Sequence, residues 1–342
     1  MKIMKLNSVI SLMLICLFAS CNKDESFKIP IIYVAGFEYG GSNNVAKYWK
    51  DGKEVALTNG TNWAEAYSIF VVENDVYVAG TEENSRGIEI AKYWKNGVPV
   101  ALTNEEFKSS RATDIFVVGN DIYVAGNEFN GLTTEAKYWK NGIAVALTDG
   151  LQSSEASAIM IFSNDIYVSG NETHNGNGRV AKYWKNGKSI SLTDGSTDSY
   201  ASDIFVDAGG IYVAGAEVKK INNTDKYIAQ YWKNGVAVPL TSSSSGVSSI
   251  IVVSDDVYLT GSESNGTKEI AKYWKNGIGF SLTDGTSYSF GHDIGVAGSD
   301  IYVVGGENTS SGFQVAKYWK NDKVIPLTNG STGSRATAIF IK

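Results

Sequence analysis

One short motif recurs along most of the chain and restricts the folds that it can form. Ala-Lys-Tyr-Trp-Lys occurs six times, and Ala229-Gln230-Tyr231-Trp232-Lys233 is a seventh copy with one change. The tryptophans of the motif lie 42 to 48 residues apart, at Trp49, Trp94, Trp139, Trp184, Trp232, Trp274 and Trp319. A period of this length indicates a repeat architecture, in which each unit buries its apolar surface against its neighbours.

Each unit contains four short runs that are rich in β-branched and aromatic residues, which is typical of strands. In the third unit these runs are residues 113–118, 122–126, 136–140 and 144–148. Turn sequences separate them, and Asn141-Gly142 is a strong hairpin signal because both residues accept a positive φ. Four antiparallel strands in each of seven units predict an all-β fold, a seven-bladed β-propeller over residues 31–342.

The repeat begins and ends out of phase. Residues 31–36 match the second strand of a unit, whereas residues 336–341 match a first strand. The two ends therefore complete one blade between them. We expect the C-terminal strand to lie beside residues 31–36 and to close the ring, which leaves no open sheet edge.

The units resemble two known repeat families. The run Asp121-Ile122-Tyr123-Val124-Ala125-Gly126, followed by a Tyr-Trp strand, is similar to kelch repeats, although the paired glycines occur only at Gly305-Gly306. The whole unit more closely resembles the HAF-type extracellular repeats of bacteria, which join a Trp-x-Asn-Gly hairpin, a Leu-Thr turn and an Ala-x-x-Ile strand. This resemblance covers about residues 31–342 and implies a propeller, but it implies no particular activity.

The N-terminus has the features of an export signal. Lys2 and Lys5 precede a mostly apolar stretch at residues 6–18, which is too short for a membrane-spanning helix of about 20 residues. The following Ala19-Ser20-Cys21 resembles a bacterial lipobox. That resemblance implies a lipoprotein signal peptide at residues 1–20 and a lipid on Cys21 that attaches the protein to a membrane. The alternative is ordinary cleavage near Ala19-Ser20, which leaves Cys21 as a free thiol.

Residues 21–30 are predicted to be a tether. Lys23-Asp24-Glu25 lies just behind the cysteine and resembles the export signal of surface lipoproteins in the Bacteroidetes group. The resemblance implies an outer-membrane lipoprotein that is exposed on the cell surface. The alternative is a plain solvated linker on a protein that faces the periplasm.

Composition excludes several classes of function. Loss of Lys2 and Lys5 with the signal peptide leaves 28 basic and 36 acidic residues, a net charge of -8, which argues against nucleic acid as a partner. Two cysteines and two histidines are too few for a disulfide framework or a Cys/His zinc site. No phosphate-binding or calcium-binding loop is present. We expect a monomeric propeller without cofactor or metal.

Two kinds of connection alternate along each unit. The Asn-Asp and Lys-Asn-Gly turns are short and nearly constant, whereas residues 39–45, 130–135, 218–227 and 308–315 differ between units. If the first strand is innermost, the variable connections share one face with the channel mouth, where propellers commonly bind ligands. The candidate ligand-binding residues near this mouth are Trp63, Arg111, Glu155, Tyr200, Phe290 and Arg335. The alternative is loop-tip variation without a function.

A glutamate recurs two residues after the strand-ending glycine of every unit, and six units have a matching lysine. Seven carboxylates could form a cation site, but ion pairs between blades, or a role as hydrogen-bond acceptors in the turns, explain them more simply. Such pairs contribute only about 0–1 kcal/mol each when exposed.

These observations favour a lipid-anchored binding or interaction module for a glycan, peptide or protein partner. Aromatic rings stack on sugars, and Arg and Glu side chains form directional hydrogen bonds. One alternative is a polysaccharide hydrolase or lyase that uses Asp114, Asp203 and Asp293 as channel-mouth carboxylates. Another is a purely structural component of the envelope. No catalytic residue is assigned, because no nucleophile motif accompanies His292 and Asp293.

Overall fold

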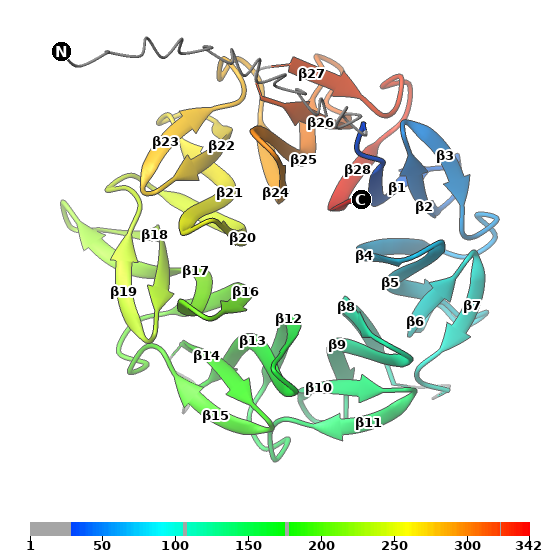
Figure 1. Ribbon diagram of the computed structural model, residues 1–342, viewed down its shortest axis with the longest axis horizontal. Coiled ribbons are helices and arrows are strands. Elements are labelled where there is room, and N and C mark those ends of the chain that lie inside the picture. Colours follow the sequence, from blue (N-terminus) through cyan, green and yellow to red (C-terminus); the bar gives the residue numbers. More distant parts are fainter. Residues whose placement is uncertain (1–28, 105–107, 175–177, 322) are drawn as a thin grey trace, which may run out of the picture.

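The computed structural model describes residues 29–104, 108–174, 178–321 and 323–342. Their strands form seven four-stranded antiparallel sheets, arranged as blades around a central channel (Figure 1). The predicted all-β, seven-bladed propeller is therefore confirmed. Within the described ranges, no helix is long and apolar enough to cross a membrane.

Blade 1 consists of β28 (Ser334–Ile341), β1 (Ile32–Tyr39), β2 (Asn44–Lys50) and β3 (Lys53–Ala56), from the channel outward. Blades 2 to 7 follow in chain order, each with its first strand innermost. Their innermost strands are β4 (Ala64–Val72), β8 (Ser110–Val118), β12 (Ser154–Phe162), β16 (Ser199–Asp207), β20 (Ser245–Val253) and β24 (Ser289–Ala297).

The second strands are β5 (Asp75–Glu83), β9 (Asp121–Phe129), β13 (Asp165–Thr173), β17 (Gly210–Ile221), β21 (Asp256–Ser264) and β25 (Asp300–Asn308). The third strands are β6 (Glu89–Lys95), β10 (Thr134–Lys140), β14 (Arg179–Lys185), β18 (Thr224–Lys233), β22 (Glu269–Lys275) and β26 (Gln314–Lys320). The outermost strands are β7 (Val98–Ala101), β11 (Ile143–Ala146), β15 (Lys188–Ser191), β19 (Val236–Pro239), β23 (Ile278–Ser281) and β27 (Lys323–Pro326).

The repeated tryptophans lie in the core between the blades. All seven are at most 1% exposed, so each places a full indole where neighbouring sheets meet. A glycine in each second strand makes room for this packing. A Cβ on Gly126 would lie 2.1 Å from the carbonyl oxygen of Arg111 and 2.8 Å from the Trp139 ring. The close approach follows a shift of register in the innermost strand, between Ala112 and Asp114.

The last strand closes the ring, as the phase of the repeat predicted. β28 pairs antiparallel with β1 from Ile32↔Ile341 to Glu38↔Ser334. In Figure 1 the red C-terminal strand lies on the channel side of the dark blue β1. Because the final strand pairs with the first, the innermost layer is complete in all seven blades.

The two faces of the ring differ in structure. We call the face with the Asn-Asp and Lys-Asn-Gly turns the turn face, and the opposite one the loop face. On the turn face, Asn141 has a φ of 51° and its side-chain oxygen accepts a hydrogen bond from the backbone N–H of Ile122. Equivalent bonds recur in the other blades, which confirms that these turns are structural.

The recurring glutamates form ion pairs, but not between blades. Lys92 lies 2.6 Å from Glu82 on the neighbouring strand of the same blade, and Lys317 lies 2.7 Å from Glu307 in the same way. The expectation of inter-blade pairs is wrong, because the glutamate and the lysine lie near each other on the hydrogen-bonded second and third strands of one sheet. The sequence spacing alone does not distinguish the two arrangements.

Candidate functional site

A ring of seven residues surrounds the channel mouth on the loop face, one from the start of each innermost strand; six of them have side chains and the seventh is a glycine. In blade order these residues are Arg335, Glu65, Arg111, Glu155, Tyr200, Gly246 and Phe290. Blades 1 to 4 thus contribute charges of alternating sign, whereas blades 5 to 7 contribute two aromatic rings and a glycine. The mouth therefore has a charged half and an aromatic half, and it breaks the sevenfold symmetry of the fold.

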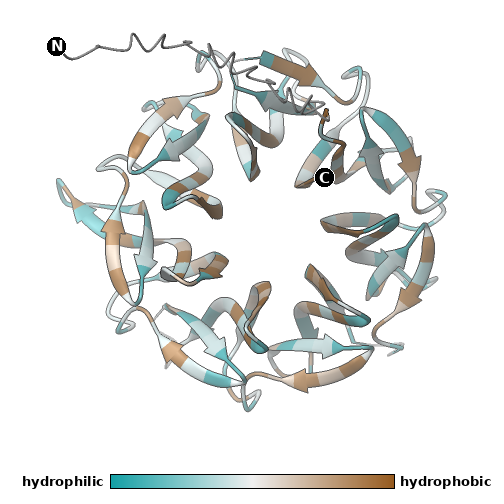
Figure 2. Ribbon diagram, viewed as in Figure 1, coloured by the Kyte–Doolittle hydropathy of each residue, from teal (hydrophilic) through white to brown (hydrophobic). Residues whose placement is uncertain are grey.

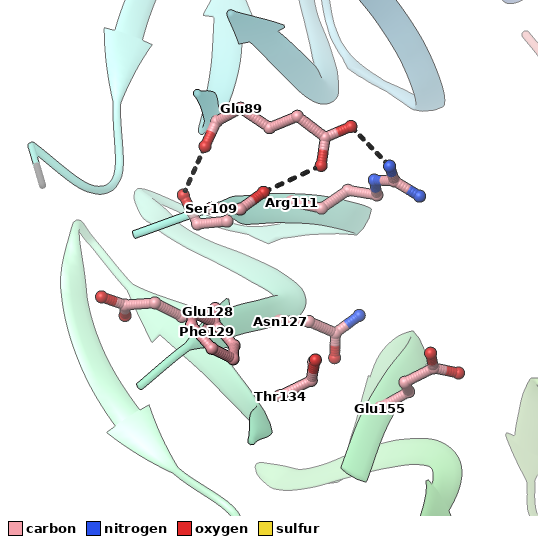
Figure 3. Close-up of a pocket in the computed structure, with 9 residues that line it drawn as sticks. Glu89, Ser109, Arg111, Asn127, Glu128, Phe129, Thr134 and Glu155 are labelled. Carbon is pink, nitrogen blue, oxygen red and sulfur yellow. Dashed lines mark hydrogen bonds and ion pairs between the residues drawn. The ribbon is translucent and has the colours of Figure 1, made fainter. Parts of the chain in front are cut away.

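The charged half contains a small polar pocket of about 180 Å³ (Figure 3). The Arg111 guanidinium is 2.5 Å from a carboxylate oxygen of Glu89, and the Ser109 hydroxyl donates to the same carboxylate at 3.0 Å. Glu155, from the next blade, lines the other side, beyond Asn127. The pocket therefore brings together Arg111 and Glu155, two of the predicted residues, but Arg111 already has a carboxylate partner.

Glu65 continues this charged network toward blade 1. Its carboxylate accepts hydrogen bonds from Asn44 at 2.7 Å and from the Tyr67 hydroxyl at 3.1 Å. Burial raises the pKa of Glu65, and the positive charges of Arg335 and Arg111 partly oppose that rise. The Arg111 guanidinium also stacks over the Tyr67 ring at 5.5 Å. Glu65 was not among the predicted residues, although it occupies the same repeat position.

The aromatic half contains a larger pocket of about 460 Å³, a size typical of small-molecule sites. Tyr200, Tyr227 and Phe290 form its apolar walls, and Gly246 lies between the blades that carry them. The rings of Tyr200 and Tyr227 are 5.7 Å apart and tilted by 53°. A Cβ on Gly246 would lie 3.0 Å from the Tyr200 hydroxyl, so a side chain there would fill the pocket.

Polar groups are interspersed with these rings. Ser244, Ser245, Ser262 and Glu269 line the same pocket, although the Ser245 hydroxyl is already bonded to the backbone of Ala229 and Ser243. Among the residues that the structure describes, the Glu269 side chain has no hydrogen-bond or ion-pair partner, so both carboxylate oxygens are available to a ligand. The pocket thus combines stacking surfaces with hydroxyl and carboxylate groups at their margin.

Two differences in length build this pocket. Strands β17 and β18 extend to Ile221 and Thr224, so the hairpin of blade 5 is longer than the others and Tyr227 lies within it. Residues 218–227 were expected to be a variable loop, and that expectation is wrong for most of them because their backbones pair as strands. In addition, the connection from Leu240 to Ser245 is two residues shorter than the one from Leu192 to Ser199.

Arg179 supports the aromatic wall from the neighbouring blade. It binds Asp198 through two nitrogens, at 3.0 and 2.8 Å, and it donates to the Tyr227 hydroxyl at 3.1 Å. Tyr227 also donates to Asp198. The hydrogen bond from Arg179 holds the pKa of Asp198 well below its usual range. The guanidinium stacks 5.6 Å from the Tyr200 ring, which fixes both tyrosines.

The six predicted residues thus have different positions. Tyr200 and Phe290 share the aromatic pocket, whereas Arg111 and Glu155 share the polar one. Arg335 is exposed on blade 1 and donates to Gln314 at 2.9 Å. Trp63 is half-buried, lies outside both pockets and accepts a backbone hydrogen bond from Glu83. The predicted lipidation site, Cys21, lies outside the described residues.

The sequence interpretation missed Arg179, Tyr227 and Glu269 because they come from third strands, not from the start of an innermost strand. One signal was available for Tyr227. The spacing of 48 residues between Trp184 and Trp232 reveals an insertion in this unit.

Below the mouth, three half-buried carboxylates line the channel. Asp114 accepts hydrogen bonds from the Ser68 hydroxyl at 2.6 Å, from its neighbour Ile115 at 2.8 Å, and from the backbone N–H of Ile159 at 2.8 Å. Ser68 and Ile159 belong to the blades on either side. Asp114 is therefore a structural link across three blades, which gives the hydrolase alternative no support.

The other two carboxylates form the same kind of link. Asp203 accepts from the backbone of Ile250 at 2.8 Å, and Asp293 accepts from Ile339 at 2.8 Å. Burial raises the pKa of Asp114 to about 6 and that of Asp203 to about 7. In the part of the chain that the structure covers, no group of three or more His, Cys, Asp or Glu is arranged to hold a metal ion.

The channel becomes apolar toward the turn face. A space of about 220 Å³ is lined there by side chains that include Phe70, Phe116, Met160, Phe205 and Phe340. The ring of Phe70 lies 4.8 Å from Phe116 and 5.1 Å from Phe340. The polar part of the channel therefore faces the loop face, where both pockets lie.

Comparison with known proteins supports the fold alone. No protein-family model and no curated protein sequence matches the chain. Among solved structures, it is similar to the β-propeller domain of the Trilobed protease from Pyrococcus furiosus, which has an open velcro topology. The TM-score is 0.54 at 10% identity, over 89% of this chain and 95% of that one.

The chain is also similar to a puromycin hydrolase, with a TM-score of 0.56 and 10% identity over 88% of this chain. A puromycin-hydrolyzing peptidase of Mycobacterium tuberculosis gives a TM-score of 0.58 and 9% identity over 86%. The chain spans only about half of each peptidase, 52% and 53% respectively. At these identities the likeness shows a shared propeller and no shared activity.

Proposed function

We propose that this protein is a binding module that takes a saccharide in the aromatic pocket of the loop face. The observation that carries this proposal is the grouping of Tyr200, Tyr227 and Phe290 with the carboxylate of Glu269 in one pocket of about 460 Å³. Sugars present apolar C–H faces and a rim of hydroxyl groups. Aromatic walls suit the faces, and serine hydroxyls and a carboxylate suit the rim.

The mouth favours a small ligand over a symmetric partner. The aromatic half spans three blades that differ from one another, and the Arg179 contacts hold two of its rings in place before any ligand arrives. Such preorganisation lowers the entropy cost of binding. The charged half is smaller, and its Arg111 is already paired with Glu89, so it supplies polar contacts beside the main pocket.

The first test is binding to a glycan array, followed by titration of any sugar that binds. Tyr227→Ala and Phe290→Ala should each weaken that binding by about 30-fold, since truncation of an aromatic anchor costs about 2 kcal/mol. Gly246→Leu should also weaken it, because the new side chain occupies the pocket.

The matched control is Tyr39→Ala. Tyr39 is an exposed aromatic residue in blade 1, outside the pocket, and its hydroxyl donates only to the neighbouring Gly41. This variant should bind the sugar normally. Equal losses for Tyr39→Ala and Tyr227→Ala, with unchanged melting temperatures, would contradict the assigned pocket.

We further propose that the protein is an outer-membrane lipoprotein, displayed on the cell surface and anchored through Cys21. The support is the sequence of the first 25 residues, with its short apolar stretch, lipobox-like cysteine and charged tether. Cys21→Ala should release the protein from the membrane fraction and abolish palmitate labelling. A variant that still labels and still sediments with membranes would disprove the anchor. Protease treatment of intact cells tests surface display separately.

A further inference from the structure

The outer edge of the turn face carries a second regular feature. The first residue of every outermost strand lies there, because each outermost strand begins directly after the Lys-Asn-Gly type of turn. In blade order these residues are Lys53, Val98, Ile143, Lys188, Val236, Ile278 and Lys323. We call this set the perimeter ring. Each member is exposed, and each is either aliphatic or a lysine.

The aliphatic members have no packing role. Val98, Ile143, Val236 and Ile278 are between 65% and 72% exposed, whereas most of the large apolar side chains of the inner strands are buried or half-buried. Figure 2 shows brown, apolar segments recurring on the outermost strands around the ring. Isolated exposed valines are common in proteins, but the same position being aliphatic in four blades and lysine in three forms a pattern.

This pattern fits a flat lipid surface. Aliphatic tips can enter the interface of a bilayer, and lysines extend their stems along it while their ammonium groups reach the lipid phosphates. The aliphatic members are spread around the whole perimeter, not gathered in the single patch that a protein partner uses.

Five lysines of this face pair with turn aspartates, whereas Asp51, Glu73, Asp207 and Asp255 have no ion pair among the described residues. Lys95, for example, lies 2.8 Å from Asp75, which keeps the paired aspartates from repelling an anionic surface. Lys140, Lys185, Lys275 and Lys320 make equivalent pairs.

The path of the chain supports the same direction. Ile31 exchanges backbone hydrogen bonds with Lys342, and Lys342 also donates through its ammonium group to the carbonyl of Glu73, in a tight turn of blade 2. The described part of the chain therefore begins at the turn face, on the C-terminal side of the sequence that contains Cys21.

We propose that the turn face lies against a lipid bilayer through the perimeter ring, so that the loop face and its pockets point away from the membrane. The direction of attachment rests on the membrane anchoring proposed above, whereas the perimeter ring is an independent observation. The proposal does not depend on the identity of the ligand.

The test uses the full-length chain reconstituted in vesicles of phosphatidylethanolamine and phosphatidylglycerol that contain spin-labelled lipids. Ile143→Cys places a fluorescent label on the perimeter ring. Leu151→Cys places the same label on the loop face, in the connection between β11 and β12, at a residue that is 69% exposed and thus closely matched. The unmodified chain, treated in the same way, gives the background from its own cysteines.

We expect the lipids to quench the label at position 143 several-fold more than the label at position 151. The added double change Val236→Asp and Ile278→Asp should reduce quenching at position 143, because it removes two of the three aliphatic members that remain in this variant. Equal quenching, or stronger quenching at position 151, would overturn the proposal. Vesicle-bound protein without quenching at either position would also overturn it, and would indicate that this face binds another protein. Loss of the anchor itself is detected separately by the Cys21→Ala comparison.

Discussion

Removal of residues 336–342 should prevent the protein from forming a stable ring. The deletion takes away nearly all of β28, which pairs with β1 and packs against blades 2 and 7. Ile339 is buried there and Phe340 and Ile341 pack against the core, and a large apolar side chain contributes about 1.5–3 kcal/mol when fully buried. Together with the lost backbone hydrogen bonds, this is comparable with the whole stability of a domain. Calorimetry should show no cooperative transition, or one at a much lower temperature.

Arg335→Ala is the control for this deletion. Arg335 lies just before the deleted segment in the same strand. Its side chain is exposed, and among the described residues it donates a hydrogen bond to Gln314 alone. Its loss should leave the melting temperature almost unchanged. A truncated chain that melts at the temperature of the intact protein would show that closure by β28 contributes little to stability.

Stability should fall as the pH rises from 5 to 8. Burial raises the pKa of Asp203 to about 7 and that of Asp114 to about 6, and it also raises the pKa of Asp293. A carboxyl whose pKa is raised on folding stabilises the fold below its ordinary pKa of about 4, and that contribution is lost as the pH rises through the folded value. A pKa that is higher by one in the folded state than in the unfolded chain corresponds to about 1.4 kcal/mol, so the melting temperature should be several degrees higher at pH 5.

The charged groups on the turn face change the stability of the fold in a lower pH range. The aspartates of the turn face, such as Asp165, have lowered pKa values because of their lysine and asparagine partners. They lose their stabilising contribution only below about pH 4. Between pH 5 and 8 the three channel carboxylates, together with Glu65, lower stability as the pH rises. His292 opposes them, because burial lowers its pKa to about 3 and its contribution to stability therefore rises with pH up to its ordinary pKa of about 6.5.

Asp203→Asn should flatten the dependence of melting temperature on pH, whatever its effect on the absolute value. Asp165→Asn is the control and should leave the slope between pH 5 and 8 unchanged. A slope that is the same in Asp203→Asn as in the unmodified protein would show that Asp203 is not protonated on folding.

The fold could be predicted from the sequence because its information is periodic. The spacing of the seven tryptophans determines the number of blades, and the mismatched strands at residues 31–36 and 336–341 determine how the ring closes. Periodicity does not reveal which strands pair a glutamate with a lysine. Glu82 and Lys92 recur together in either arrangement, and only the register of β5 with β6 places them in one blade.

The candidate site was only partly predictable for a related reason. Tyr200 and Phe290 stand out because they occupy one repeat position with different chemistry. Tyr227 and Glu269 occupy other repeat positions, and they join the pocket through the contact between blades. A comparison of equivalent positions finds the residues that share a place in the unit, but it does not find residues that meet across a blade boundary.

Each of the three channel aspartates accepts hydrogen bonds from isoleucine N–H groups of two neighbouring blades, and this pairing cannot include all seven blades of the ring. Each one serves the backbone N–H of its own isoleucine, as for Ile115, and Asp114, Asp203 and Asp293 also reach the isoleucine of the following blade. Three acceptors placed on alternate blades serve six positions. The seventh position is the backbone N–H of Ile69 in blade 2. Among the described residues no carboxylate accepts a hydrogen bond from it, because the preceding blade has Ala338 at the position of the aspartate.

With three aspartates that each bind two positions, a ring of seven blades leaves one position unbound, and that position lies in blade 2, next to the blade in which the two ends of the chain meet. Gene duplication that inserted a single unit with an aspartate before blade 2 would complete the alternation and produce an even ring without a gap. Insertion of a unit that lacks the aspartate would instead leave two neighbouring positions unserved. The hydrogen bonds of the channel therefore depend on whether the number of blades is odd or even. Insertion of one aspartate-containing unit before blade 2 would provide a carboxylate acceptor for every blade.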